Sequence, residues 1–132
     1  MLPLDLALAL RDAGLRWEPR PGDAFAVPDR DLDDQVFVLS DMVVQTLHPP
    51  DGPPILAFNG TTEWALDSLE AHEAVWLPRE DQLRTLLEDT FAGLERVPGP
   101  PEAYAVTAAG SRHVDLTPEA AYARAVLAGL SR

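Results

Sequence analysis

Turn-forming sequences interrupt the first half of the chain repeatedly, and they limit its fold more than any other feature. PGD at 21–23, HPPDGPP at 48–54 and NG at 59–60 each favour a change of chain direction. The segments between them are short and rich in β-branched residues, which is typical of strands. VFVLSDMVVQTL at 36–47 predicts one bent strand or two short ones, and ILAF at 55–58 predicts the next strand.

Asn59-Gly60 is the strongest hairpin signal, because a two-residue type I′ turn needs a positive φ at both central residues. With this turn, Ile55 lies opposite Trp64, and the indole lies on a mostly apolar face. The sequence therefore predicts a hairpin up to about Leu66, followed by a short helical turn after Asp67.

A helix is the alternative for residues 62–73. TEWALDSLEAHEA has good helix propensity, and Thr61 or Thr62 is a suitable N-cap. The hairpin is the favoured interpretation, because it explains why the single asparagine of the chain stands before a glycine.

Three further segments predict helices. The Ala- and Leu-rich residues 3–13 end before a glycine, which suits a helix end. A second helix begins near Pro78, and a third begins with Thr117 as N-cap followed by proline. The predicted packing stripes are Leu83, Leu86, Leu87 and Thr90 on the second helix, and Tyr122, Val126, Leu127 and Leu130 on the third.

LERV, YAVTAA and RHVDL predict a second meander of short strands between the last two helices. Strands and helices do not alternate regularly, so a parallel sheet is not indicated. The expected fold is α+β, with an antiparallel sheet built from β-meanders and about three helices packed mainly on one side. The length of 132 residues predicts a single domain, 1–132.

The formal net charge is −12, with 22 acidic residues, ten arginines and no lysine. A surface this negative repels phosphate, so direct nucleic-acid binding is not expected, and anionic membranes should be avoided as well. The absence of cysteine excludes disulfides and Cys-based metal sites. The N-terminus lacks the pattern of a signal peptide, and we expect a soluble, cytoplasmic protein.

Asp29, Asp31 and Asp33 have the alternating spacing with which calcium loops begin. The sixth position of such a loop is Asp34 rather than glycine, and the twelfth is Ser40 rather than glutamate. A solvated acidic loop is therefore favoured over a metal site. No cofactor is expected, because phosphate-binding glycine loops and nucleophile elbows are missing from the sequence.

His48, His72 and His113 do not have the spacing of a metal-binding motif. His113 and Asp115 share one face of a predicted strand, where they form either a pair or, more commonly, part of a polar outer face.

Glu63, Trp64 and Asp67 are the candidate binding residues. In the hairpin register Glu63 lies beside large apolar residues, and burial there would raise the pKa of its carboxyl. Trp64 and the other two tryptophans, Trp17 and Trp76, either line a groove or fill the core, and the core is favoured.

FNGTTEWALDS and VWLPREDQL resemble a group of small bacterial proteins of uncharacterised activity, largely from actinobacteria and related GC-rich lineages. The likeness extends from ALRDAGLRWEPRPGD to AAYARAVL. That group sometimes carries a pilus-assembly label, which would imply an ATPase, but a Walker motif is missing from this sequence.

The negative charge is interpreted first as a feature that keeps the protein soluble, and the alternative is attraction of a basic protein partner. The leading functional hypothesis is an acidic binding or regulatory module without catalytic activity. A homodimer through an apolar sheet face or a strand edge is a further prediction. Two alternatives stay open. One is a small metal-assisted hydrolase that uses the acidic loop, and the other is an antitoxin-like or DNA-mimicking inhibitor of a basic partner.

Overall fold

The computed structural model describes residues 1–28, 32–39, 44–47, 50, 55–58, 68–70 and 74–131, with the backbone alone for 32–35, 44–47, 55–58 and 68–70. The chain forms two compact units. One consists of Met1–Arg16 with Leu77–Arg132, and the other of Trp17–Trp76. We call them the helical unit and the central unit.

The central unit is made of short strands, as the turn-rich sequence predicts. Its strands are β1 (Ala24–Val27), β2 (Leu32–Val38), β3 (Val44–Leu47), β4 (Ile55–Phe58), β5 (Ser68–Glu70) and β6 (Val75–Leu77), the last residue of which belongs to the helical unit. They form two sheets, with the orders β2-β1-β6 and β3-β4-β5. The stretch at 36–47 therefore belongs to two strands rather than to one bent strand.

The strand after the Asn-Gly sequence pairs in a different register from the predicted one. β4 and β5 are antiparallel, but Ile55 lies opposite Glu70 and Ala57 opposite Ser68. The expected pairing of Ile55 with Trp64 is therefore wrong. A helical turn after Asp67, and a helix running to residue 73, are also wrong at Ser68–Glu70, which is a strand.

The physical reason lies in what each register places opposite Leu56. A two-residue turn would put Glu63 there, whereas the observed register pairs Leu56 with Leu69. Cross-strand pairing of apolar residues stabilises a sheet, and it outweighs the preference of a short turn sequence. Residues 59–67, with the Asn-Gly pair, lie outside the described residues.

A buried carboxylate fixes the start of the central unit. Asp23 is only 3% exposed, and it accepts hydrogen bonds from the Trp17 indole Nε1 at 2.9 Å and from the Arg20 backbone N–H at 3.1 Å. The half-buried Trp17 ring also lies 5.5 Å, centroid to centroid, from Phe25, which lies 5.4 Å from Phe37. Trp17 therefore packs on the sheet, as the core interpretation of the tryptophans predicts.

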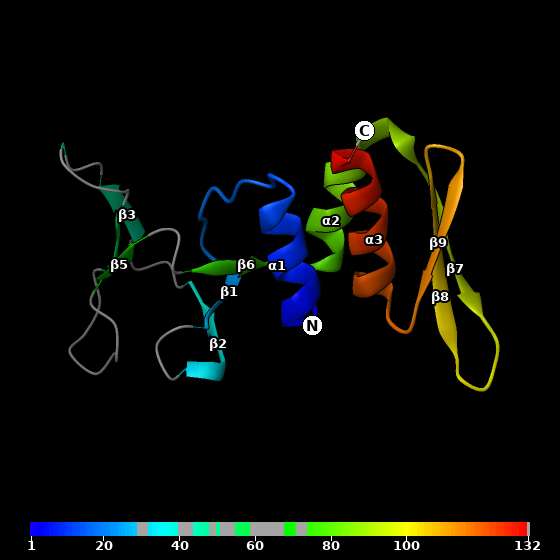
Figure 1. Cartoon of the computed structure of the whole chain (residues 1–132), viewed down its shortest axis with the longest axis horizontal. Coiled ribbons are helices and arrows are strands. Elements are labelled where there is room, and N and C mark those ends of the chain that lie inside the picture. The colour runs from blue at the N-terminus through cyan, green and yellow to red at the C-terminus, as the bar shows by residue number, and fades with distance from the viewer. Residues whose placement is uncertain are drawn as a thin grey trace. The chain divides into compact units, whose positions relative to one another are not determined.

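The helical unit contains α1 (Leu4–Asp12), α2 (Glu80–Leu87), a 3₁₀ turn at Glu88–Thr90 and α3 (Pro118–Leu130). Its sheet is the meander β7 (Phe91–Val97), β8 (Ala103–Ala108) and β9 (Ser111–Asp115), antiparallel throughout. In Figure 1, α3 lies between this sheet and the other two helices. The predicted α+β class with antiparallel sheets is confirmed.

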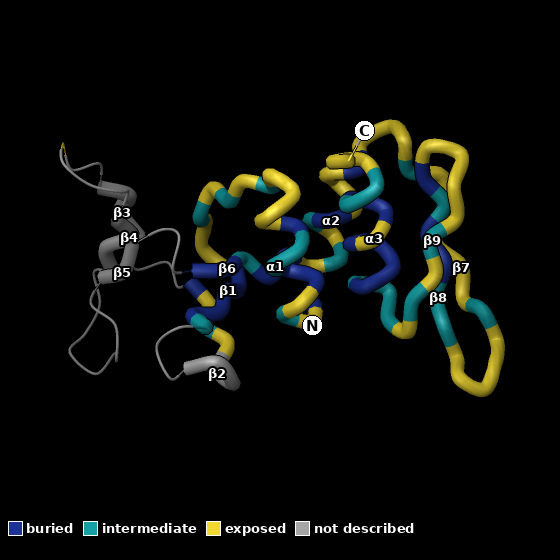
Figure 2. Tube along the Cα trace, in the orientation of Figure 1, coloured by how far each residue is buried: buried dark blue, intermediate teal, exposed yellow. Residues whose placement is uncertain are grey.

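α3 begins where the sequence predicts and is buried more widely than expected. The Thr117 hydroxyl accepts a hydrogen bond from the Ala120 backbone N–H at 3.2 Å, and Pro118 fills the first helical position. The buried positions run around most of the helix: Ala120, Ala121, Tyr122, Ala123, Ala125 and Val126. Figure 2 shows this burial along α3 and β8. Helix α3 is therefore covered on two sides, which is consistent with its apolar sequence.

One leucine of each predicted packing stripe remains exposed. Leu83 and Leu87 of α2 are buried, but Leu86 is 39% exposed. At the end of α3, Leu130 is 37% exposed. Exposed leucines at neighbouring helix ends form an apolar surface that the core does not use.

The turn between β8 and β9 contains an alanine in a conformation that alanine disfavours. Ala109 has φ 51° and Gly110 has φ 79°, the pattern of a type I′ turn. Alanine loses about 1 kcal/mol in this left-handed region, whereas asparagine tolerates it.

We expect Ala109→Asn to raise the free energy of unfolding by about 0.5–1 kcal/mol in urea denaturation. Ala13→Asn is the control, because Ala13 is exposed in a right-handed conformation at φ −79°. An equal gain in both variants would contradict the assignment of strain to the turn.

Candidate functional site

The candidate residues from the sequence fall mainly outside the described part of the chain. Asp29, Asp31, Glu63, Trp64 and Asp67 all lie there, so their binding roles stay predictions. Asp33 belongs to β2, where the backbone alone is described. In the described ranges, no group of three His, Asp or Glu side chains is placed to hold a metal ion.

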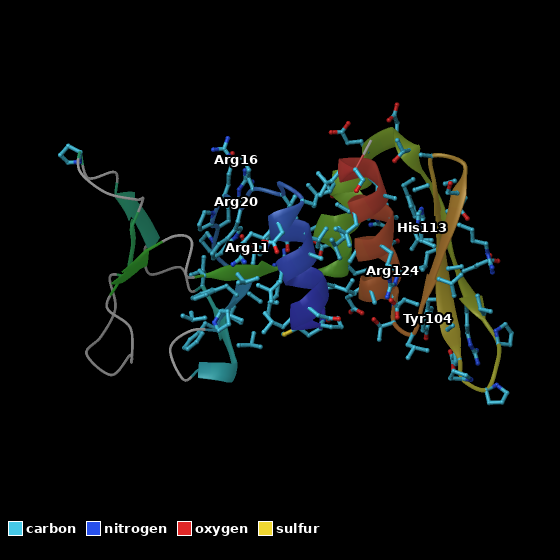
Figure 3. All side chains as sticks on the ribbon, in the orientation of Figure 1. Arg11, Arg16, Arg20, Tyr104, His113 and Arg124 are labelled. Carbon is cyan, nitrogen blue, oxygen red and sulfur yellow. The ribbon has the colours of Figure 1, made fainter. Side chains whose placement is uncertain are left out.

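An ion pair joins α3 to the sheet of the helical unit. Arg124 Nε contacts Asp115 Oδ2, and the Leu116 backbone N–H donates to Asp115 Oδ1 at 2.7 Å. Burial acts to raise the pKa of the Asp115 carboxyl, but these two partners outweigh it and hold the pKa below its ordinary value. Tyr104 lies opposite Asp115 and donates to Glu102 at 3.1 Å, which raises the pKa of the tyrosine. Figure 3 shows Arg124 reaching from α3 toward the sheet.

His113 lies on the same side of β9 as Asp115, facing the helix rather than solvent. Its cross-strand neighbour is the fully buried Val106, and its Nε2 is buried without a hydrogen-bond partner. The expectation of a polar outer face at His113 and Asp115 is therefore wrong, because Arg124 makes the buried side of the strand favourable for a carboxylate. These residues hold the helix on the sheet.

A groove opens at the carboxyl ends of the three helices, and we call it the carboxyl-end groove. Its volume is about 350 Å³. The lining residues are Leu15, Leu86, Leu87, Glu88, Thr90, Ala108, Ala109, Ala125, Val126, Gly129 and Leu130. Small residues from α3 and the β8–β9 turn meet larger leucines from the helix ends, and the open groove has both apolar and polar surface.

The electrostatics of this groove follow from the helix directions. Leu15 lies just beyond the end of α1, Glu88 caps α2, and Leu130 ends α3 (Figure 1). Helix carboxyl ends have partial negative charge, because their last carbonyl groups point outward. Among the described residues that line the groove, Glu88 is the charged one, and its side chain is exposed. The groove therefore combines an apolar surface with negative potential.

Two residues of the groove are poor local choices for stability. Gly129 is the next-to-last residue of α3, and a Cβ built there meets nothing within 4 Å, so close packing does not require a glycine. Glu88 has φ 54° and ψ −133°, a conformation that favours glycine. The sequence signal for this groove is the isolated glycine near the end of an apolar helix.

Negative charge is distributed unequally between the two units. Residues 17–76 contain 12 of the 22 acidic residues but only two of the ten arginines. This segment therefore accounts for −10 of the net charge of −12, and the helical unit for −2.

No protein-family model matches the chain, and neither does a curated protein or a solved structure. Among the helices of the described ranges, none has the length and apolar character needed to cross a membrane.

The Asp115 carboxylate gives a pH-dependent prediction. Since its pKa is lowered in the fold, ionised Asp115 stabilises the fold above the pKa of the unfolded chain, and this contribution is lost as the pH falls through the folded pKa. We expect Asp115→Asn to reduce the free energy of unfolding by about 1–2 kcal/mol at neutral pH, with the difference shrinking below about pH 4.

Urea denaturation between acidic and neutral pH measures this difference. Glu95→Gln is the control, because Glu95 forms an exposed pair with Arg112 at 2.9 Å, and we expect a loss below about 1 kcal/mol. If Asp115→Asn lowers the free energy of unfolding by the same amount at every pH, the stabilisation does not depend on the charge of Asp115, and the prediction is wrong.

Proposed function

We propose that this chain is a cytoplasmic, non-catalytic binding module that recognises a basic protein partner. The observation that supports the proposal best is the concentration of negative charge in residues 17–76. A segment with twelve acidic residues and two arginines presents one sign of charge to any molecule that approaches it.

Such a charge distribution favours some partners and opposes others. It attracts lysine- and arginine-rich protein surfaces over roughly a Debye length, about 8–10 Å at physiological salt. It repels the phosphates of nucleic acids for the same reason. Long-range attraction of this kind mainly raises the association rate and selects the partner by its charge.

The polar contacts of the described residues also support binding over catalysis. Asp23 binds the Trp17 indole, and Asp115 binds Arg124, so both of these carboxylates already have structural partners. The orphan ring nitrogen of His113 is enclosed between β9 and α3. A general base needs hydrogen-bond reach to a substrate, and these groups face the interior.

The test compares two variants of the full chain that lose the same number of charges. One variant carries Asp29→Asn, Asp31→Asn, Asp33→Asn and Asp34→Asn. The control carries Asp5→Asn, Asp12→Asn, Asp81→Asn and Glu95→Gln, all at exposed positions of the helical unit. Fluorescence anisotropy with a labelled lysine–alanine peptide measures affinity at several salt concentrations.

We expect the natural chain to bind this peptide more weakly as salt rises. The first variant should lose about fivefold or more in affinity at low salt, and clearly more than the control, because residues 17–76 create most of the field. Equal losses in the two variants, or binding that does not respond to salt, would refute the proposal. A duplex DNA of similar length should not bind.

A further inference from the structure

We propose that the carboxyl-end groove is the docking site for an amphipathic segment of the partner protein, one that presents leucine-like side chains next to a lysine or arginine. This inference rests on the proposed function, because it takes the partner to be basic. It adds a specific surface, in the helical unit, to an attraction that comes mainly from residues 17–76.

The apolar part of the segment follows from the groove lining. Leu86 and Leu130 are 39% and 37% exposed at the ends of α2 and α3. Ala125 and Gly129 line the same groove, whose volume is about 350 Å³. This volume is at the lower end of the range for binding pockets, about 300–1,000 Å³, and suits inserted side chains rather than a large ligand. Covering the two leucines would remove apolar surface from water.

The basic part of the segment follows from the charges around the same surface. Three helices end there, and α3 has no basic residue in its last turn to offset its negative end. α1 and α2 each have an arginine in the last turn, Arg11 and Arg84, and Arg11 is paired with Asp12 at 3.2 Å, so α3 is the helix whose negative end has no basic residue on its own last turn. Glu88 contributes a full negative charge from the groove itself, and the exposed Asp89 follows it. A lysine or arginine beside the apolar anchor would complement this potential.

Local stability would favour other residues at two positions of the lining. Glycine at position 88 would relieve the positive φ, and alanine at 129 would stiffen the helix without a clash. Both changes would alter the groove, the first by removing its carboxylate and the second by narrowing it. Residues that are unfavourable for the fold and meet at one surface indicate a function for that surface.

The experiment uses the full chain and three synthetic amphipathic helical peptides. The first has leucines at i, i+3, i+4 and i+7 with lysines beside them, the second replaces lysine by glutamate, and the third replaces leucine by serine. Calorimetric titration at about 0.15 M salt, where surface attraction is partly screened, gives the dissociation constants. The first peptide should bind at least about tenfold more tightly than either of the others.

Gly129→Phe fills the groove from a position with free space around it, and we expect about a tenfold or greater loss in affinity for the first peptide. Val114→Phe is the matched control, because Val114 is 43% exposed and lies on the opposite side of the sheet from α3. The affinity of the Val114→Phe variant for the first peptide should stay within about twofold of that of the natural chain. Thermal unfolding of both variants verifies the fold.

Glu88 gives a second, independent set of variants. Glu88→Gln should weaken binding severalfold and leave the melting temperature unchanged, because the backbone strain remains. Glu88→Gly should weaken binding to a similar extent and raise the melting temperature, because the strain is relieved. Opposite signs for affinity and stability at one residue are not expected of a purely structural role.

The outcomes separate the two proposals. If the substitutions in the groove leave affinity unchanged while neutralising the acidic residues of 17–76 weakens it, the groove inference is overturned and the proposed function stands. If the serine peptide binds as tightly as the leucine peptide, the groove inference also fails. If the first peptide, which has both leucines and lysines, does not bind, the groove inference and the proposed function both fail. If the groove variants bind weakly and Val114→Phe binds normally, both are supported.

Discussion

The burial of α3 on two sides is the constraint on which the helical unit depends. Small residues, among them Ala121 and Ala123, let α3 lie close to the neighbouring elements. The Tyr122 side chain packs against these elements, and only 1% of its surface is exposed. The Tyr122 ring lies 5.6 Å from Phe91 of the sheet, centroid to centroid, and its burial raises the pKa of its hydroxyl. A helix this apolar needs cover on both sides, so the sheet takes one side and α1 and α2 take the other.

This arrangement has an electrostatic consequence. α1 and α2 pack on α3 so that all three carboxyl ends surround one groove. Like ends of helix dipoles repel one another, which makes this end of the unit a favourable place for a cation. The apolar ends of α2 and α3 and the negative potential around them therefore have a common origin in the packing of α3.

The sequence predicted those elements whose signals are local and strong. Thr117-Pro118 marks the start of α3, and the second meander appears as β7, β8 and β9. The register of β5 could not be predicted, because it depends on Leu69 meeting Leu56 across a connection whose length the Asn-Gly signal does not set. The groove was missed because Leu86 and Leu130 have the periodicity of core residues, and their exposure depends on where neighbouring helices end.

The unequal charge of the two units gives this small chain two different surfaces. The central unit has most of the negative charge, whereas the helical unit is nearly neutral and has the apolar groove. Long-range attraction and short-range apolar contact are separate contributions to protein recognition, the first acting mainly on association and the second on dissociation. A division of this kind suits a module that selects a basic partner and then holds it.

Native-state hydrogen exchange in low urea tests the central role of α3 most directly. If the helix is covered on two sides, the amides of residues 121–126 exchange only through global unfolding, with an opening free energy equal to the free energy of unfolding and the same dependence on urea. Exchange of these amides through local openings that do not respond to urea, while β8 stays protected, would contradict the account.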